Sequence, residues 1–82
     1  MIRFRGTPVT VEEAHELAAR LRDRGQAPGL DVATRLERAS VLGDGLIAAD
    51  REQARVVLRV IEEWAPERLR AVADELRTFV AS

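Results

Sequence analysis

Few side chains in this sequence could carry out acid–base or nucleophilic chemistry. Lys, Cys and Tyr are absent, and His15 is the single histidine. Histidine ordinarily titrates near neutral pH, but a catalytic imidazole needs a nucleophile or a second base beside it. The few Ser and Thr hydroxyls stand in no recognisable nucleophile motif. We therefore interpret His15 as a surface or boundary residue, and the sequence predicts no catalytic residue and no enzymatic activity.

Metal and phosphate sites are not indicated either. A zinc site needs three or four clustered nitrogen, oxygen or sulfur ligands, which a chain with one His and no Cys does not offer. Neighbouring carboxylates such as Glu12 and Glu13 point about 100° apart on a helix and do not chelate one ion. Asp44 lies between two glycines, but the alternating acidic ligands of a calcium loop and the third glycine of a phosphate loop are missing. The sequence thus predicts no metal and no cofactor.

Arginine supplies all 13 basic residues, against 14 acidic residues, and the net charge is −1. Exclusive use of arginine indicates a GC-rich, bacterial source. A nucleic-acid binder is normally basic overall or in one block. Arg3, Arg5, Arg22 and Arg24 would form a local basic patch if the N-terminal segment lay beside the first helix. A regulatory DNA- or RNA-binding protein is therefore the alternative function, and the net charge disfavours it.

The N-terminal residues alternate between apolar and charged side chains, which predicts a short β-strand at about residues 2–5. A second arm at about residues 8–11 would complete a hairpin that turns at Gly6-Thr7. Pro8 weakens this second arm because proline cannot donate a hydrogen bond to a strand partner.

The rest of the chain shows helical periodicity and predicts a small bundle of four helices. Their expected ranges are about 11–24, 31–42, 51–65 and 66–80. Capping boxes, in which a side chain and a backbone N–H three residues apart bond reciprocally, mark two of the starts, at Thr10–Glu13 and Asp50–Gln53.

The other helix boundaries rest on single residues. Asp31 is expected to cap the second helix, and Pro66 to occupy the first position of the fourth. Gly25 and Gly43 are expected to end the first and second helices. The apolar link at residues 46–49 is expected to tuck under the helices. The fold class is therefore mainly α, a single small domain over residues 1–82 with a short N-terminal strand or hairpin.

A chain of 82 residues buries only a small core. Because the chain has no cysteine for disulfides, association with a partner subunit is the remaining common source of added stability. We therefore predict a small non-enzymatic protein–protein interaction or assembly module that self-associates as a homodimer, with another protein as a further partner. An N-terminal strand could pair across a two-fold axis, and several apolar side chains lie off the main helix faces. The candidate interface residues are Ile2, Phe4, Val41, Val56 and Trp64.

No apolar run approaches the roughly 20 residues that a membrane span requires. The first five residues also lack the apolar block of an export signal. The expected location is the cytoplasm, with no membrane partner.

Overall fold

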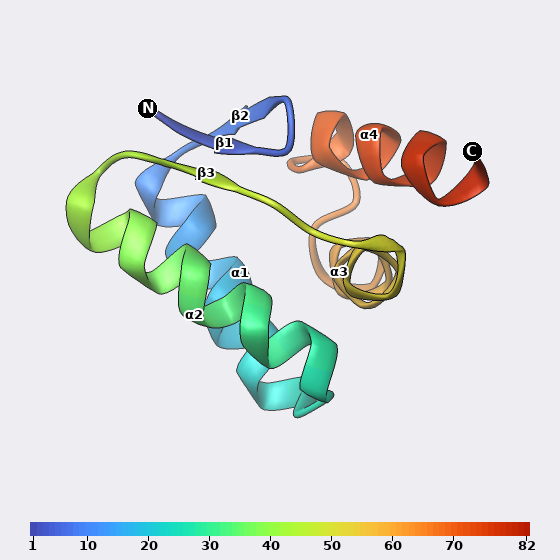
Figure 1. Cartoon of the computed structure of the whole chain (residues 1–82), viewed down its shortest axis with the longest axis horizontal. Coiled ribbons are helices and arrows are strands. Elements are labelled where there is room, and N and C mark those ends of the chain that lie inside the picture. The colour runs from blue at the N-terminus through green and yellow to red at the C-terminus, as the bar shows by residue number, and fades with distance from the viewer.

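The N-terminal residues form the middle of a small sheet, which lies against four helices in a computed structural model that describes residues 1–82 (Figure 1). The elements in chain order are β1 (Ile2–Phe4), β2 (Thr7–Val9), α1 (Val11–Arg24), α2 (Ala27–Leu42), β3 (Gly45–Ile47), α3 (Arg51–Trp64) and α4 (Arg70–Ala81). The prediction of a mainly α fold with four helices and N-terminal strands is confirmed.

The sheet has the strand order β2-β1-β3, with β1 antiparallel to β2 and parallel to β3. The hairpin forms, but it turns at Arg5-Gly6, one residue earlier than expected, so its second arm is residues 7–9. Arg5 adopts a left-handed backbone with φ 54°, a conformation that glycine usually supplies in tight hairpin turns. Pro8 lies in the edge strand β2, where a missing N–H costs no ladder bond.

The strand β3 corrects the expectation for the apolar link at residues 46–49. Gly45 to Ile47 extend beside β1 instead of tucking under the helices, and successive side chains of a strand point to opposite faces. Ile47 is consequently buried, whereas Leu46 is 70% exposed.

Both predicted capping boxes are present. The Thr10 hydroxyl accepts a hydrogen bond from the backbone N–H of Glu13 at 3.0 Å, and Glu13 accepts from the N–H of Thr10 at 2.9 Å. Asp50 and Gln53 make the same exchange at 2.8 and 2.9 Å. Because these bonds satisfy backbone donors that a helix start leaves free, α1 and α3 begin where the sequence places them.

Two other helix starts were predicted wrongly. α2 begins at Ala27, four residues before the expected cap, because Pro28 fits the first helical turn, and Asp31 lies exposed within the helix. α4 begins at Arg70, because residues 66–69 form turns instead of continuing from Pro66. Neither start has a side-chain cap.

α1 and α2 form an antiparallel pair, α4 crosses over α3, and the sheet spans from the end of α2 to α4 (Figure 1). One core of 21 buried hydrophobic residues fills the space between them. Gly29 allows α2 to approach its neighbours closely, since a Cβ there would lie 3.0 Å from Val56 and 3.3 Å from Leu21. None of the helices combines the length and apolar character needed to cross a bilayer.

Candidate interaction surfaces

Two of the predicted interface residues belong to the core instead. Ile2 is 1% exposed and Phe4 is fully buried. Both lie in β1, which is the central strand and is paired on each side within the chain. The expectation that β1 pairs with a partner is therefore corrected, because β1 has no free edge and its apolar side chains pack inward.

Val41 lies on the surface with 85% of its area exposed. It belongs to a group that holds every large hydrophobic side chain the chain exposes, which we call the apolar end. Its members are Met1, Val11, Val41, Leu42 and Leu46.

The members of the apolar end are neighbours in the fold. Val41, Leu42 and Leu46 fall in one six-residue segment where α2 ends and β3 begins. Val11 and Val41 line one hollow, and the amino group of Met1 bonds to Asp44 within this segment at 2.9 Å. The backbone positions of these residues thus gather at the end of the molecule where α1 starts and α2 stops, and the Leu46 side chain lines a second hollow with Arg5, Ala48 and Glu75.

The segment takes this shape because two glycines turn the chain. Gly43 ends α2 in the left-handed conformation with φ 73°, and its N–H donates to the Ala39 carbonyl at 2.7 Å. Gly45 has φ 152°, and a Cβ there would lie 3.2 Å from that of Ala39. The chain therefore doubles back directly over α2, and the side chains beside the turn, including Leu42, are left outside the core.

The outer edge of β3 is also unpaired. Gly45 and Ile47 bond to β1 through the Gly45 N–H and the Ile47 carbonyl, so the backbone groups of Leu46 between them face the free edge. One carbonyl farther along is covered, because Arg35 donates to the Ala48 oxygen at 3.0 Å. The free stretch is therefore short and is centred on Leu46.

His15 lies beside the apolar end in an arrangement that gives no catalytic pair. The imidazole lines the same hollow of about 450 Å³ as Val11, Ser40 and Val41. The Ser40 hydroxyl donates to the backbone carbonyl of Glu37 at 2.9 Å and not to the imidazole. No three His, Asp or Glu side chains are grouped as metal ligands would be.

Val56 and Trp64, the remaining predicted interface residues, are half-buried on α3. The Trp64 ring lies between two guanidinium groups, with Arg20 at 5.3 Å and Arg68 at 5.0 Å from its centre. Such cation–π contacts hold the ring at the surface, where it packs against the core from outside. The two residues thus lie away from the apolar end, on a separate face.

Most of the arginines in the predicted basic patch have partners within the chain. Arg5 stacks on the Phe79 ring at 3.6 Å, with Glu75 at 3.8 Å, and Arg24 bonds to Glu63 at 2.8 Å.

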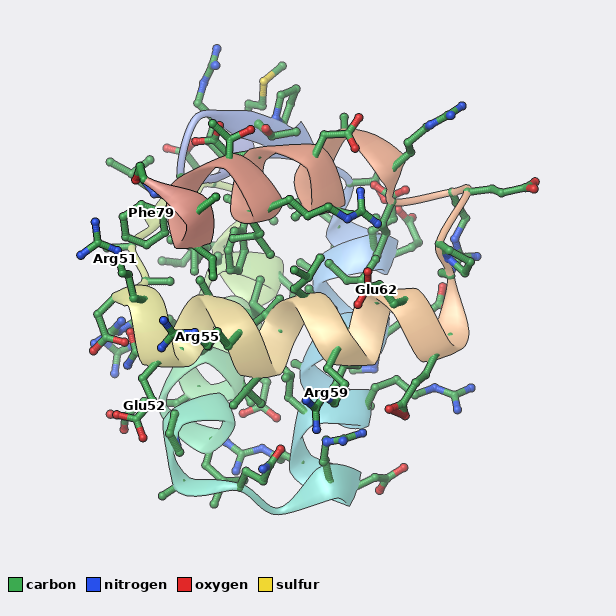
Figure 2. The ribbon with its side chains drawn as sticks, turned by 90° about the vertical axis from the view of Figure 1, so that its right-hand side faces the viewer. Arg51, Glu52, Arg55, Arg59, Glu62 and Phe79 are labelled. Carbon is green, nitrogen blue, oxygen red and sulfur yellow. The ribbon has the colours of Figure 1, made fainter.

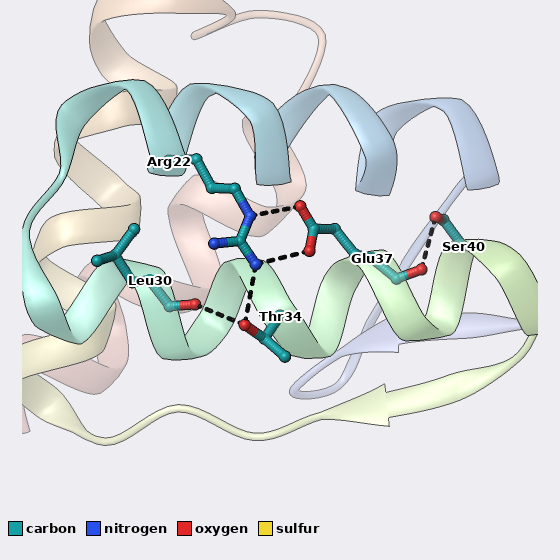
Figure 3. Close-up of polar contacts among 5 residues, drawn as sticks. All are labelled: Arg22, Leu30, Thr34, Glu37 and Ser40. Carbon is teal, nitrogen blue, oxygen red and sulfur yellow. Dashed lines mark hydrogen bonds and ion pairs between the residues drawn. The ribbon is translucent and has the colours of Figure 1, made fainter.

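The fourth side chain of that patch, Arg22, holds α1 against α2 (Figure 3). Its guanidinium donates to both carboxylate oxygens of Glu37, at 2.6 and 2.7 Å, and to the Thr34 hydroxyl at 3.0 Å. These hydrogen bonds lower the pKa of Glu37 and raise the pKa of Arg22, because each stabilises the charged form of its partner. Only Arg3 of the patch has no ion-pair or stacking partner, so nothing specific favours nucleic-acid binding by these four residues.

Four residues of the apolar end, Met1, Val11, Leu42 and Leu46, were missed from the sequence, and signals were present for the two leucines. Leu42 lies seven residues after Arg35, so it shares an outer face of α2. Leu46 alternates with Ile47 in a three-residue strand, but residues 46–49 also form a continuous apolar run, which hides the alternation.

Comparison with known protein families, characterised proteins and solved structures finds no match for this chain.

Proposed function

We propose that this chain is a small non-enzymatic interaction or assembly module that pairs with a second copy of itself through the apolar end. The observation that carries this proposal is the exposure of three aliphatic side chains in one short segment: Val41 at 85%, Leu42 at 71% and Leu46 at 70%. Grouped aliphatic residues in water carry a free-energy cost that burial against a partner removes.

A second copy fits this surface for two reasons. Two-fold pairing places the same apolar patch on both sides, so hydrophobic residues meet hydrophobic residues without any matching of charge. The unpaired backbone groups of Leu46 also lie beside this patch, at an edge that a second β3 could meet in antiparallel fashion. A dimer would add buried area to the modest core of an 82-residue chain.

The same proposal places the module in the cytoplasm, the reducing compartment in which stability without disulfides is the rule. Its role there would be to hold an assembly together or to bind another protein while paired.

Analytical ultracentrifugation over a range of concentrations tests this proposal. We expect the mass to rise from the 9.1 kDa of one chain towards twice that value as concentration increases. Leu46→Glu should weaken the dimer by at least about tenfold, because it buries a carboxylate among aliphatic side chains. Ala71→Glu is the matched control, since Ala71 is an exposed apolar residue on α4, outside the apolar end.

A mass that stays at one chain up to millimolar concentration would overturn the proposal. Equal weakening by Leu46→Glu and Ala71→Glu would do the same, because it would trace the effect to net charge and not to this surface. Circular dichroism of each variant shows whether the fold is retained.

A further inference from the structure

A groove runs along α3 on a different face from the apolar end, and we propose that it binds an acidic amphipathic helix of another protein. The groove lies between α3 on one side and, on the other, the last turns of α1 and the start of α2. It consists of two hollows of about 490 and 280 Å³, which follow one another along α3.

The floor of the groove is an apolar row at helical spacing. Val56, Val60 and Trp64 are four residues apart, so they lie one above another on the same side of α3. Val60 is 5% exposed, and Val56 and Trp64 are half-buried. A row of this kind spans about 12 Å of helix axis, which matches two to three turns of a second helix.

Arginines without a carboxylate partner stand on the α3 wall of this groove. Arg55 and Arg59 line the smaller hollow, one turn apart, whereas Arg51 turns away towards α4 and lies 5.7 Å from the centre of the Phe79 ring (Figure 2). Like charges at this spacing repel one another along a helix. Arg51 donates to the Ser82 carbonyl at 2.6 Å, but neither Arg55 nor Arg59 has an ion pair within the chain.

The carboxylates near this row are largely engaged elsewhere. Glu62 pairs with Arg77 at 3.2 Å, and Glu63 pairs with Arg24 at 2.8 Å within the larger hollow, which leaves Glu52 as the one free acid on α3. The smaller hollow therefore holds two arginines without an ion pair against one free carboxylate, and its net charge is positive.

A helix with carboxylates beside an apolar row satisfies both features at once. Its apolar side chains would contact the floor, and acidic residues four apart would meet Arg55 and Arg59, because both helices repeat at the same spacing. Nucleic acid fits less well, since a phosphate strand has no apolar side chains to cover the exposed part of Val56.

Trp64 makes the binding directly measurable, because it is the only tryptophan of the chain and lies in the groove. The probe is a synthetic helical peptide of about 18 residues, long enough to be partly helical alone, with leucines on one face and glutamates beside them. A peptide in which every glutamate is replaced by lysine is its matched control. We expect the acidic peptide alone to shift the Trp64 emission in a saturable way.

Charge reversal in the protein completes the test. The double variant R55E/R59E should bind the acidic peptide at least about tenfold more weakly and should gain affinity for the lysine peptide. The double variant R3E/R70E, which changes two exposed arginines elsewhere, should bind the acidic peptide as the unaltered protein does. Leu46→Glu, which alters only the apolar end, should also leave peptide binding unchanged. The tests of peptide binding and of self-association are therefore independent of each other.

Three results would overturn the proposal. The first is that both peptides bind equally, or that neither binds at about 1 mM. The second is that R55E/R59E binds the acidic peptide as well as R3E/R70E does. The third is that a single-stranded oligonucleotide displaces the acidic peptide at lower concentration than the peptide itself requires.

Discussion

The inner and outer faces of α2 contrast in how they use the same residue type. Leu36 is fully buried between the helix pairs, whereas Leu42, less than two turns later, is 71% exposed. The difference comes from the helix face, because six residues turn an α-helix by about 240°. Leu42 therefore shares the exposed face of Arg35, seven residues earlier, and not the buried face of Leu36. A leucine on the outer face of α2 is thus free to contact a partner, whereas a leucine on the inner face stabilises the fold.

Truncating each leucine to alanine tests this contrast, and it should give the greatest change in stability of the variants considered. Leu36→Ala should lower the free energy of unfolding by about 2–5 kcal/mol, because it removes buried methyl groups and leaves a cavity. Leu42→Ala should change it by less than about 0.5 kcal/mol, because its side chain is already in water. Urea unfolding measured below the dimerisation concentration checks both values.

Centrifugation of the same two variants gives the reverse order. Leu42→Ala should raise the dimer dissociation constant, while the folded fraction of Leu36→Ala should pair as the unaltered protein does. Equal loss of stability in the two variants would show that Leu42 belongs to the core and would remove the distinction between the two faces of α2.

Local chemistry explains which parts of the fold could be predicted. The capping boxes at Thr10 and Asp50 and the left-handed glycines at positions 25 and 43 depend on residues within one turn, so the sequence shows them directly. β3 could not be found in this way, because three residues form a strand only when β1 lies beside them. The start of α4 likewise depends on tertiary packing, since no side chain caps it.

The candidate surfaces were predicted less well for a related reason. Periodicity identifies which side chains share a face, and it separated Val41 from the buried face of its helix. It does not tell whether a short strand lies at the edge or the centre of a sheet, and for this reason Ile2 and Phe4 were assigned to an interface. The arginine row of α3 was visible as charge, but its lack of partners follows only from where Glu62 and Glu63 find theirs.

The glycines that end α1 and α2 allow a second test, with a smaller expected change in stability. Gly25 and Gly43 have nearly equal φ of 74° and 73°, and a Cβ at either would meet no atom within 4 Å. Alanine at either position should therefore cost about 1 kcal/mol of stability from backbone strain alone. Only Gly43→Ala should also weaken the dimer. Gly43 sets the direction in which the chain leaves α2 and so positions the apolar end, whereas Gly25 lies at the opposite end of the α1–α2 pair. A loss of pairing in Gly25→Ala of the same size would argue against the apolar end as the contact.

The ion pair between Arg22 and Glu37 joins α1 to α2 away from the apolar end, and its loss should change stability least. Bonding to Arg22 lowers the pKa of Glu37 from its ordinary value of 4.5 in the folded protein. A lowered pKa means that the folded state favours the ionised carboxylate, so its stabilising contribution is present above pH 4.5 and is lost as the pH falls through the lowered value. Glu37→Gln should therefore lower Tm by a few degrees at neutral pH, and the difference from the unaltered protein should vanish in acid and shrink in high salt. Glu52→Gln, which removes an exposed carboxylate with no ion pair, is the control for pairing. Because neither charge belongs to the apolar end, both variants should pair normally at neutral pH, and a loss of pairing in Glu37→Gln alone would place the α1–α2 seam within the contact.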